Sequence, residues 1–263
     1  MVGPEQLHSA ALLGRIDVRG VSFWYPDGTR ALSAVDLVLA ARRINVVFGP
    51  ARAGKSSLLR LLNRLQDLVP GARHTGDVLL NGVGIFGPEV DVSDLRRRVS
   101  MVFAVPTPLP GSIRANLTYG LRMAGHRDTA FLEDRVEWSL QQAALWDEVK
   151  DRLDSSAYAL SGGQRQRLCL ARSLALGPEV ILLDNPTSGL DPLSTALVEN
   201  ALQVLKDQVT IVMVPHSTQQ AARLADRAAF FLDGELVEAG AGAEIFLGPT
   251  DKRTEDYVTG RFG

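Results

Sequence analysis

Short strands are predicted wherever apolar residues alternate with polar ones or run together between turn signals. These segments cover residues 16–23, 34–39, 44–48, 76–80, 100–103, 180–183, 209–214, 230–232 and 235–237. Asp27-Gly28 predicts a hairpin near the N-terminus, and Asp233-Gly234 predicts a closing hairpin near the C-terminus. The two ends of the chain are therefore expected to contribute antiparallel strands.

Helical spacing of apolar residues appears between most of these strands. The predicted helices cover residues 57–62, 94–98, 112–150 and 163–176, and two more begin near Pro192 and Thr218. Ser93 is expected to cap the helix at residue 94, and a proline suits a first helical turn. Strands that alternate with helices imply a parallel sheet. We therefore expect an α/β fold with a mixed central sheet, an antiparallel β subdomain and an inserted helical segment.

A glycine-bounded loop, Gly49-Pro50-Ala51-Arg52-Ala53-Gly54-Lys55-Ser56, lies between the strand at 44–48 and the next helix. The order strand, loop, helix is typical of a P-loop, whose backbone N–H groups and helix dipole attract phosphate. Lys55 is expected to reach the β- and γ-phosphates, as a catalytic residue, and the Ser56 hydroxyl to bind Mg²⁺. A chance match would leave Lys55 as a solvated lysine. The nucleotide-binding residues expected here are Gly49, Pro50, Ala51, Arg52, Ala53, Gly54, Lys55, Ser56 and Ser57.

Arg52 is unusual in this loop, because P-loops often carry glycine at that position. If the position requires a positive φ, arginine costs about 1 kcal/mol in the left-handed region. We therefore expect nucleotide binding to be weakened but retained.

Three further segments carry candidate chemistry. Asp184 ends a buried strand, where a carboxylate can support Mg²⁺, although an aspartate at a strand end is commonly a turn or cap residue. Leu160-Ser161-Gly162-Gly163-Gln164 places a small-residue turn at a helix start, which suits a second phosphate site. Tyr25 follows a strand ahead of the P-loop, where it either packs on the sheet or stacks on adenine.

Composition narrows the class of protein. The chain has 263 residues, 46% of them apolar, which is enough for a large core. A net charge of −2 argues against a broad nucleic-acid surface, so no nucleic-acid partner is expected. The lone Cys169 excludes an intrachain disulfide and reads as a small buried residue. No signal peptide and no apolar run of about 20 residues are apparent, so we expect a cytosolic protein whose membrane role comes through a partner.

The motifs together resemble the ATP-binding-cassette (ABC) ATPases, and the resemblance covers essentially the whole chain. It rests on the order and spacing of residues 49–56, 160–164, 181–184, 188–191 and His216. It implies a P-loop NTPase fold in a single domain of residues 1–263, with an α/β core at 1–92 and 161–263 and a helical insertion at about 93–160. Within that superfamily the chain resembles the ATP-binding subunits of bacterial phosphate importers. The narrower match rests on residues 106–108, 119–122, 219–223 and 251–263.

The resemblance also implies how the residues act. ATP with Mg²⁺ would lie between the P-loop of one copy and the turn of its head-to-tail partner, which is a second copy or a homologous ATPase subunit. In that arrangement Tyr25 would stack on adenine, Asp191 would link the two sites, His216 would contact the γ-phosphate, and Ser56 and Asp184 would hold the metal. The turn contributes Ser161, Gly162, Gly163 and Gln164. Transmembrane permease subunits would dock near residues 104–120 and hold the protein at the cytoplasmic face of the inner membrane.

Two departures from the family bear on the reaction. Asn185 stands where the family has the glutamate that polarises the attacking water, and an amide cannot accept that proton. Ala104 stands where the family has a glutamine that binds Mg²⁺ and senses the permease. Pro215, before His216, is a third oddity, which a strand end tolerates. We therefore predict an ATP hydrolase of the transporter class whose turnover is slowed by about 10²–10⁴-fold.

Other functions stay open at this stage. In one alternative the chain is a non-hydrolysing or regulatory subunit that pairs with a catalytically competent partner. In another, His216 compensates for the missing glutamate and the chain is an ordinary slow transport ATPase. A role on nucleic acid or ribosomes ranks below these, because the chain has one cassette and no basic face.

Overall fold

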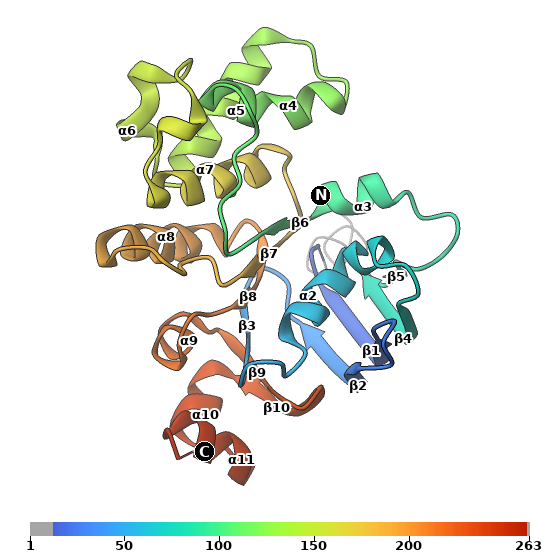
Figure 1. The fold of residues 1–263 in the computed structure, drawn as a ribbon. Helices are drawn as coiled ribbons and strands as arrows, with labels where there is room; N and C mark the ends of the chain where they lie inside the picture. Colours follow the sequence, from blue (N-terminus) through green and yellow to red (C-terminus); the bar gives the residue numbers. More distant parts are fainter. Residues whose placement is uncertain (1–12, 262–263) are drawn as a thin grey trace, which may run out of the picture.

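The computed structural model describes residues 13–261, and these fold as two β-sheets with a helical unit on one side (Figure 1). The strands are β1 (Ile16–Trp24), β2 (Arg30–Leu39), β3 (Ile44–Phe48), β4 (Arg73–Leu80), β5 (Val83–Gly84), β6 (Val99–Val102), β7 (Val180–Asp184), β8 (Thr210–Val214), β9 (Arg227–Leu232) and β10 (Glu235–Ala241). The α-helices are α2 (Lys55–Leu62), α3 (Val92–Arg98), α4 (Ile113–Met123), α5 (Thr129–Gln142), α6 (Trp146–Val149), α7 (Gly162–Ala175), α8 (Pro192–Leu205), α9 (Thr218–Leu224), α10 (Gly242–Leu247) and α11 (Lys252–Val258). Short 3₁₀ turns cover Leu65–Leu68, Lys150–Arg152 and Ala157–Ala159. Within residues 13–261, no helix combines the length and the apolar character needed to cross a bilayer.

The larger sheet has the strand order β10-β9-β3-β8-β7-β6. All neighbours in it are parallel except β9 and β10, which form the closing hairpin. Strands β3, β7 and β8 are buried along their whole length, as the uninterrupted apolar runs predicted. The mixed central sheet expected from the sequence is confirmed.

The smaller sheet has the order β2-β1-β4-β5 and is antiparallel throughout. Side chains along β1 and β2 alternate between buried and more exposed, so one face packs inward and the other meets solvent. This sheet is the predicted antiparallel β subdomain.

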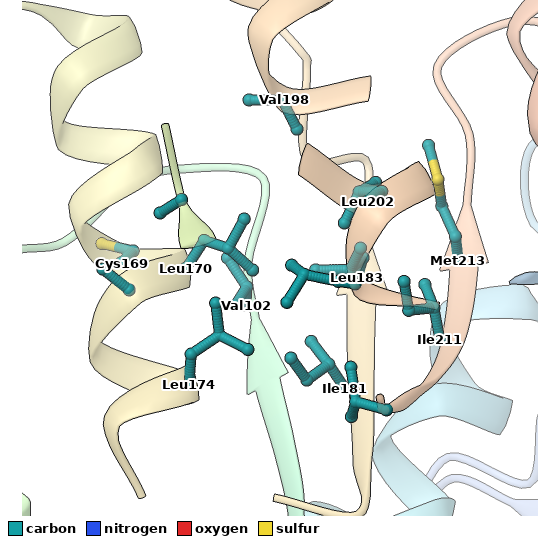
Figure 2. Close-up of a cluster of buried hydrophobic side chains, with 14 of the residues drawn as sticks. Val102, Cys169, Leu170, Leu174, Ile181, Leu183, Val198, Leu202, Ile211 and Met213 are labelled. Carbon is teal, nitrogen blue, oxygen red and sulfur yellow. The ribbon is translucent and has the colours of Figure 1, made fainter. Parts of the chain in front are cut away.

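The larger sheet lies between two apolar layers because alternate side chains on its strands point to opposite faces. Ile44, Val46 and Phe48 of β3 face a cluster that includes residues of α7, α8, α9 and α10. Val47 of the same strand faces α2 and the smaller sheet. Figure 2 shows part of the first layer, where Leu202 of α8 packs beside Leu183 of β7.

Two local expectations are corrected by the structure. The cap of α3 is Asp91, whose carboxylate accepts hydrogen bonds from the N–H groups of Ser93 and Asp94, so Ser93 is already inside the helix. The segment of about 93–160 expected as the helical insertion also includes the strand expected at residues 100–103. Strand β6 lies within it and pairs with β7 at the edge of the larger sheet, so the helical unit begins at α4.

We predict that Leu202→Ala lowers the free energy of unfolding by about 2–5 kcal/mol, because Leu202 is fully buried and its truncation leaves a cavity. Leu193→Ala is the matched control, since Leu193 lies on the same helix and is 72% exposed. The control should change the unfolding free energy by less than about 0.5 kcal/mol. Urea denaturation of the two variants decides, and equal losses would contradict the packing described here.

Candidate functional site

The loop after β3 takes a conformation that its glycine makes possible. Gly49 has φ 142°, and a Cβ atom at that position would lie 2.0 Å from the carbonyl oxygen of Phe231 on β9. No side chain fits in that space. The chain therefore leaves β3 close against β9 and turns back into α2.

Arg52 has φ 65°, which is the left-handed conformation that the sequence analysis considered. Its side chain is exposed at the lip of the loop. The conformation costs about 1 kcal/mol for a residue with a side chain. The strain predicted at this position is therefore present in the fold.

Lys55 closes the loop from inside. Its Nζ donates hydrogen bonds to the carbonyl oxygens of Gly49 at 2.8 Å and Pro50 at 2.5 Å. Burial lowers the pKa of Lys55, and the charge of Asp184 opposes that shift. The ammonium group is thus held at the start of α2, where a phosphate would supply a stronger counter-charge than two carbonyl dipoles.

The N-terminus of α2 is suited to an anion. Gly54 occupies the cap position, and among the described residues no side chain caps the helix or places an acid in its first turn. The first N–H groups of a helix have no partner within the helix and carry part of the positive end of its dipole. A bound phosphate would complete these hydrogen bonds.

Ser56, at the start of α2, contacts Asp184, at the end of β7, although the two are far apart in the sequence. The Ser56 hydroxyl donates to a carboxylate oxygen of Asp184 at 3.1 Å. Hydroxyl and carboxylate oxygens are ligands that Mg²⁺ prefers, usually together with waters and phosphate oxygens. The pair therefore fits the metal position predicted for these two residues.

Lys55 lines two hollows. One, of about 460 Å³, is lined by Tyr25, Thr29–Ala31 and residues 52–57. The other, of about 490 Å³, is lined by Gly49, Asn185, His216 and their neighbours. P-loop residues line both hollows, so a long ligand with its phosphates on the loop can extend into both.

Tyr25 lies in the first hollow and is partly buried. Its hydroxyl is 2.9 Å from the Ser57 hydroxyl, and its ring meets Phe23 edge-on at 5.0 Å. These contacts fix the ring beside the P-loop. The structure brings Tyr25 together with the predicted phosphate site, and its stacking on adenine stays a prediction.

Asn185 and His216 share the second hollow with Lys55. Asn185 has φ 49°, its N–H donates to the carbonyl of Val214 at 2.9 Å, and its side-chain amide reaches Asp184 at 3.4 Å. His216 is exposed and follows Pro215 at the end of β8. Ala104, which is among the described residues, lines neither hollow.

The predicted turn at residues 161–164 lies elsewhere on the molecule. Of the residues that the structure describes, none from this turn lines either hollow. Ser161 and Gln164 form a capping box, in which the Ser161 hydroxyl accepts from the Gln164 N–H and the Gln164 side chain accepts from the Ser161 N–H. Ser161 and Gly162 are exposed, so this part of the turn is available to another molecule, whereas Gly163 is buried.

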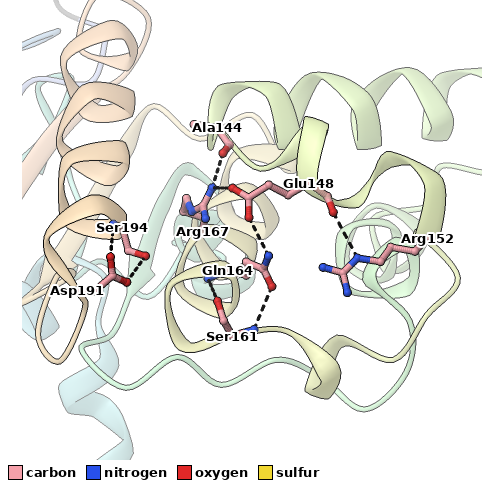
Figure 3. Close-up of polar contacts among 8 residues, drawn as sticks. All are labelled: Ala144, Glu148, Arg152, Ser161, Gln164, Arg167, Asp191 and Ser194. Carbon is pink, nitrogen blue, oxygen red and sulfur yellow. Dashed lines mark hydrogen bonds and ion pairs between the residues drawn. The ribbon is translucent and has the colours of Figure 1, made fainter.

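A carboxylate that the sequence analysis missed supports this turn. Glu148 accepts from the Gln164 side-chain amide at 2.7 Å and from Arg167 at 2.5 Å (Figure 3). Arg167 is 3% exposed, and Glu148 is the counter-ion that compensates its buried positive charge. The helical unit thus supports the turn through Glu148 of α6. No local sequence motif identifies Glu148, because its partners lie 16 and 19 residues away.

Asp191 caps α8, which begins near the same turn. Its carboxylate accepts from the N–H of Ser194 at 2.9 Å and from the Ser194 hydroxyl at 2.6 Å, and these bonds lower the pKa of Asp191 (Figure 3). A Cβ atom at Gly163 would lie 2.3 Å from the Ser194 hydroxyl oxygen. A glycine at this position therefore allows the turn and the Asp191 cap to approach closely.

A P-loop on a parallel sheet, a lysine at the helix start and a serine–aspartate pair together define a P-loop nucleotide-binding protein. Residues 32–188 match the sequence pattern of the ABC transporter family. The chain is also 49% identical, over 95% of its length and 98% of theirs, to the phosphate import ATP-binding proteins PstB of two Bacteroides fragilis strains and of Bacteroides thetaiotaomicron. The chain therefore belongs to the ABC transporter family of ATPases, as the motifs predicted.

Solved structures show the same fold at low sequence identity. The chain superposes with cbiO1 of Clostridium perfringens, part of the ABC transporter complex cbiONQ, with a TM-score of 0.78 and 22% identity over 89% of this chain and 90% of that one. It also superposes with a bacterial Atm1-family ABC exporter with ATP bound, with a TM-score of 0.74 and 24% identity over 89% of this chain and 39% of that one. The P-loop ABC ATPase fold is thereby confirmed.

We predict that Glu148→Gln destabilises the chain in a pH-dependent way. The hydrogen bond from Arg167 lowers the pKa of Glu148 below its ordinary value of 4.5. The contact therefore stabilises the folded state above that value and is lost as the pH falls through the folded-state pKa. The difference in unfolding free energy between parent and variant should be full at about pH 7 and shrink toward zero as the pH is lowered through the folded-state pKa of Glu148.

Urea unfolding across this pH range measures that difference. Glu137→Gln serves as the control, because Glu137 is exposed on α5 and accepts a hydrogen bond from Gln141 on the same helix. A Glu148→Gln deficit of the same size at both ends of the range would show that the carboxylate's charge has no part in holding the turn.

Proposed function

We propose that the protein is the ATP-binding subunit of an ABC importer, of the phosphate-importing kind, and that it hydrolyses ATP slowly. The observation that supports this most directly is the joining of Lys55, Ser56 and Asp184 at one end of the sheet, with Asn185 in the place of a general base. The PstB proteins, which are 49% identical to the chain, carry the phosphate assignment. The transported solute is proposed on that likeness.

Nucleotide binding is assigned to the two hollows and the loop that lines both. The N–H groups at the start of α2 and the Lys55 ammonium would hold the phosphates, Ser56 and Asp184 would hold Mg²⁺, and Tyr25 would face the base. The metal supplies Lewis-acid stabilisation of charge on the phosphate oxygens. An asparagine at position 185 removes none of these groups, so ATP binding is retained.

Water activation is the step that this chain performs poorly. A general base accepts the proton of the attacking water, and the Asn185 amide offers only a carbonyl oxygen that does not take up a proton near neutral pH. Asn185 and His216 line the same hollow as Lys55, where their side chains would orient water by hydrogen bonds. A positioned base contributes typically ~10²–10⁴-fold, which is the expected deficit.

Two copies acting head to tail would complete each site. The turn at Ser161 is exposed and lies away from the hollows of its own chain, so it is free to meet the P-loop of a partner. Asp191 lies at the start of α8 and is exposed beside that turn. ATP-driven closure depends on contacts to the phosphates in the closed state and does not require bond cleavage.

The permease is proposed to dock on a groove between the core and the helical unit. This groove, of about 350 Å³, is lined by Phe103, Leu109, Tyr119 and Arg172, among others. Phe103 is 47% exposed and Tyr119 is 58% exposed, so the surface is unusually apolar for one that faces water. Docking there would place the protein at the cytoplasmic side of the membrane, peripherally, through its permease.

The decisive test is the variant Asn185→Glu, which restores an acid at the end of β7. We expect phosphate release to rise by about 10²–10⁴-fold, with ATP affinity and ATP-dependent dimerisation close to those of the parent. Lys55→Ala is the control and should abolish both binding and dimerisation. The unfolding midpoint is recorded in parallel, because a glutamate at φ 49° costs the fold about 1 kcal/mol.

The measured turnover distinguishes a slow transport ATPase from a regulatory subunit. Family-typical turnover in the parent would refute the slow-hydrolysis part of the proposal and leave the transporter assignment intact. No turnover in either protein, with ATP-driven association intact, would favour the alternative of a regulatory subunit that pairs with a competent partner.

The docking groove predicts that Val105→Asp weakens recovery of a permease. Val105 is 75% exposed on the loop after β6, two residues beyond Phe103, which lines the groove, and a charge there opposes an apolar partner at the rim. Recovery of the detergent-solubilised permease with the tagged protein should fall by about tenfold. Val83→Asp, at a residue that is 68% exposed on the other sheet, should leave recovery unchanged. Equal loss in both variants would remove the groove from the proposal.

A further inference from the structure

The buried side-chain amide of Gln220 accepts a hydrogen bond that is different from the one expected in a helix capping box. Ser217 caps α9, and Gln220 is the third residue of that helix. In a capping box the side chain at this place accepts from the N–H of the cap residue itself, as Gln164 does for Ser161 in α7. Gln220 instead accepts from the N–H of His216, one residue earlier, at 2.9 Å.

The other end of the Gln220 amide is committed to two different segments. Its nitrogen donates to the Thr187 hydroxyl at 2.9 Å and to a carboxylate oxygen of Glu199 at 2.9 Å. Thr187 lies two residues after Asn185 in the loop that follows β7. Glu199 belongs to α8, the helix that Asp191 caps, and it pairs with Arg223 at 2.8 Å. One side chain therefore ties His216 to the β7 loop and to α8.

Burial makes this arrangement specific. Gln220 is 3% exposed and Thr187 is 4% exposed, so water does not replace their partners freely. The amide can take only one orientation, because the reversed one would set its carbonyl against the Glu199 carboxylate and its NH₂ against the His216 N–H. The preceding residue, Pro215, has no N–H, so the His216 amide is the first donor available after β8.

We propose that Gln220 is the positioning residue of His216. It fixes the backbone that carries the imidazole, and it makes His216, the loop after Asn185 and α8 move as one unit. This inference rests on the proposed function, in which His216 orients water in the hollow that it shares with Lys55.

The test uses a swap of chemical groups. Gln220→Ala removes the acceptor for His216, and Gln220→Glu keeps an acceptor but sets a carboxylate against Glu199. The double variant Gln220→Glu with Glu199→Gln restores a carboxylate–amide pair of opposite polarity, with the net charge unchanged. Gln208→Glu is the matched control, because Gln208 is exposed and its side chain bonds to Gln142 on the surface.

The first readout is hydrogen exchange of the His216 amide, measured by NMR in the nucleotide-free protein. Exchange should become about tenfold faster in Gln220→Ala, the factor that corresponds to one lost hydrogen bond. It should rise by a similar factor in Gln220→Glu, because repulsion from the Glu199 carboxylate moves the acceptor away from the His216 N–H. It should return to within about threefold of the parent in the double variant. The control should match the parent.

The second readout is single-turnover ATP hydrolysis. The two single variants should lower the hydrolysis rate by about 10–100-fold with ATP affinity changed by less than about threefold, since a displaced His216 affects orientation more than binding. The double variant should recover most of the rate.

Two outcomes overturn the proposal: unchanged exchange at His216 in the single variants, or a double variant no better than Gln220→Glu. The unfolding midpoint is recorded for each variant, and if Gln220→Ala does not fold, the comparison of Gln220→Glu with the double variant decides. Exchange is measured without nucleotide, so it tests the positioning role by itself. A parent that neither binds ATP nor dimerises with it would overturn the proposed function while leaving the exchange result standing.

Discussion

The parallel strands β3, β8 and β7 have their carboxyl ends side by side in the larger sheet, and the candidate site depends on that alignment. The register pairs Val46 of β3 with Met213 of β8, and Asp184 of β7 with Val214 of β8. Neighbouring strands lie about 4.8 Å apart, so whatever follows each strand is delivered to the same place. This is why Ser56 reaches Asp184 across 128 residues of sequence and why His216 lines a hollow with Lys55. The P-loop and the histidine need only follow a buried strand, and the acid need only be the last residue of one.

Much of this could be read from the sequence because it depends on local patterns. Uninterrupted apolar runs marked β3, β7 and β8, and the glycine and lysine spacing marked the loop between β3 and α2. The glycine that P-loops often carry at position 52 raised the question of a left-handed Arg52, and the structure answers it with φ 65°. Local patterns were weaker at element ends. Ser93 and Asp91 are both good caps two residues apart, and only the folded backbone shows that Asp91 holds the position.

The rest could not be read, because it consists of side chains that meet through tertiary packing. Glu148 supports the exposed turn through Gln164 and neutralises the buried Arg167, yet each residue alone looks like an ordinary helix-surface residue. Gln220 looks like a helix-start glutamine until the structure places Thr187 and Glu199, 33 and 21 residues away, against its nitrogen. Such contacts carry no periodicity and no fixed spacing. They are visible only when the helical unit and α8 are set against the sheet.

Position 185 has two roles under the proposed function: its backbone keeps the strand end in place, and its side chain acts on the attacking water. Asn185 can serve the first role but cannot accept a proton in the second. The backbone of Asn185 keeps the strand end in register by donating to Val214, and asparagine tolerates φ 49° better than most side chains do. A glutamate there would bring a second carboxylate near Asp184, and like charges disfavour the ionised form of each. Asn185 instead turns a donor toward Asp184, so the charge that pairs with Ser56 is held by a neutral neighbour. Under the proposed function, the contact between Ser56 and Asp184 that would hold the metal does not depend on an acid at position 185, whereas water activation does. Binding and bond cleavage would therefore place separate demands on the carboxyl end of these strands, and the substitution would weaken only the second.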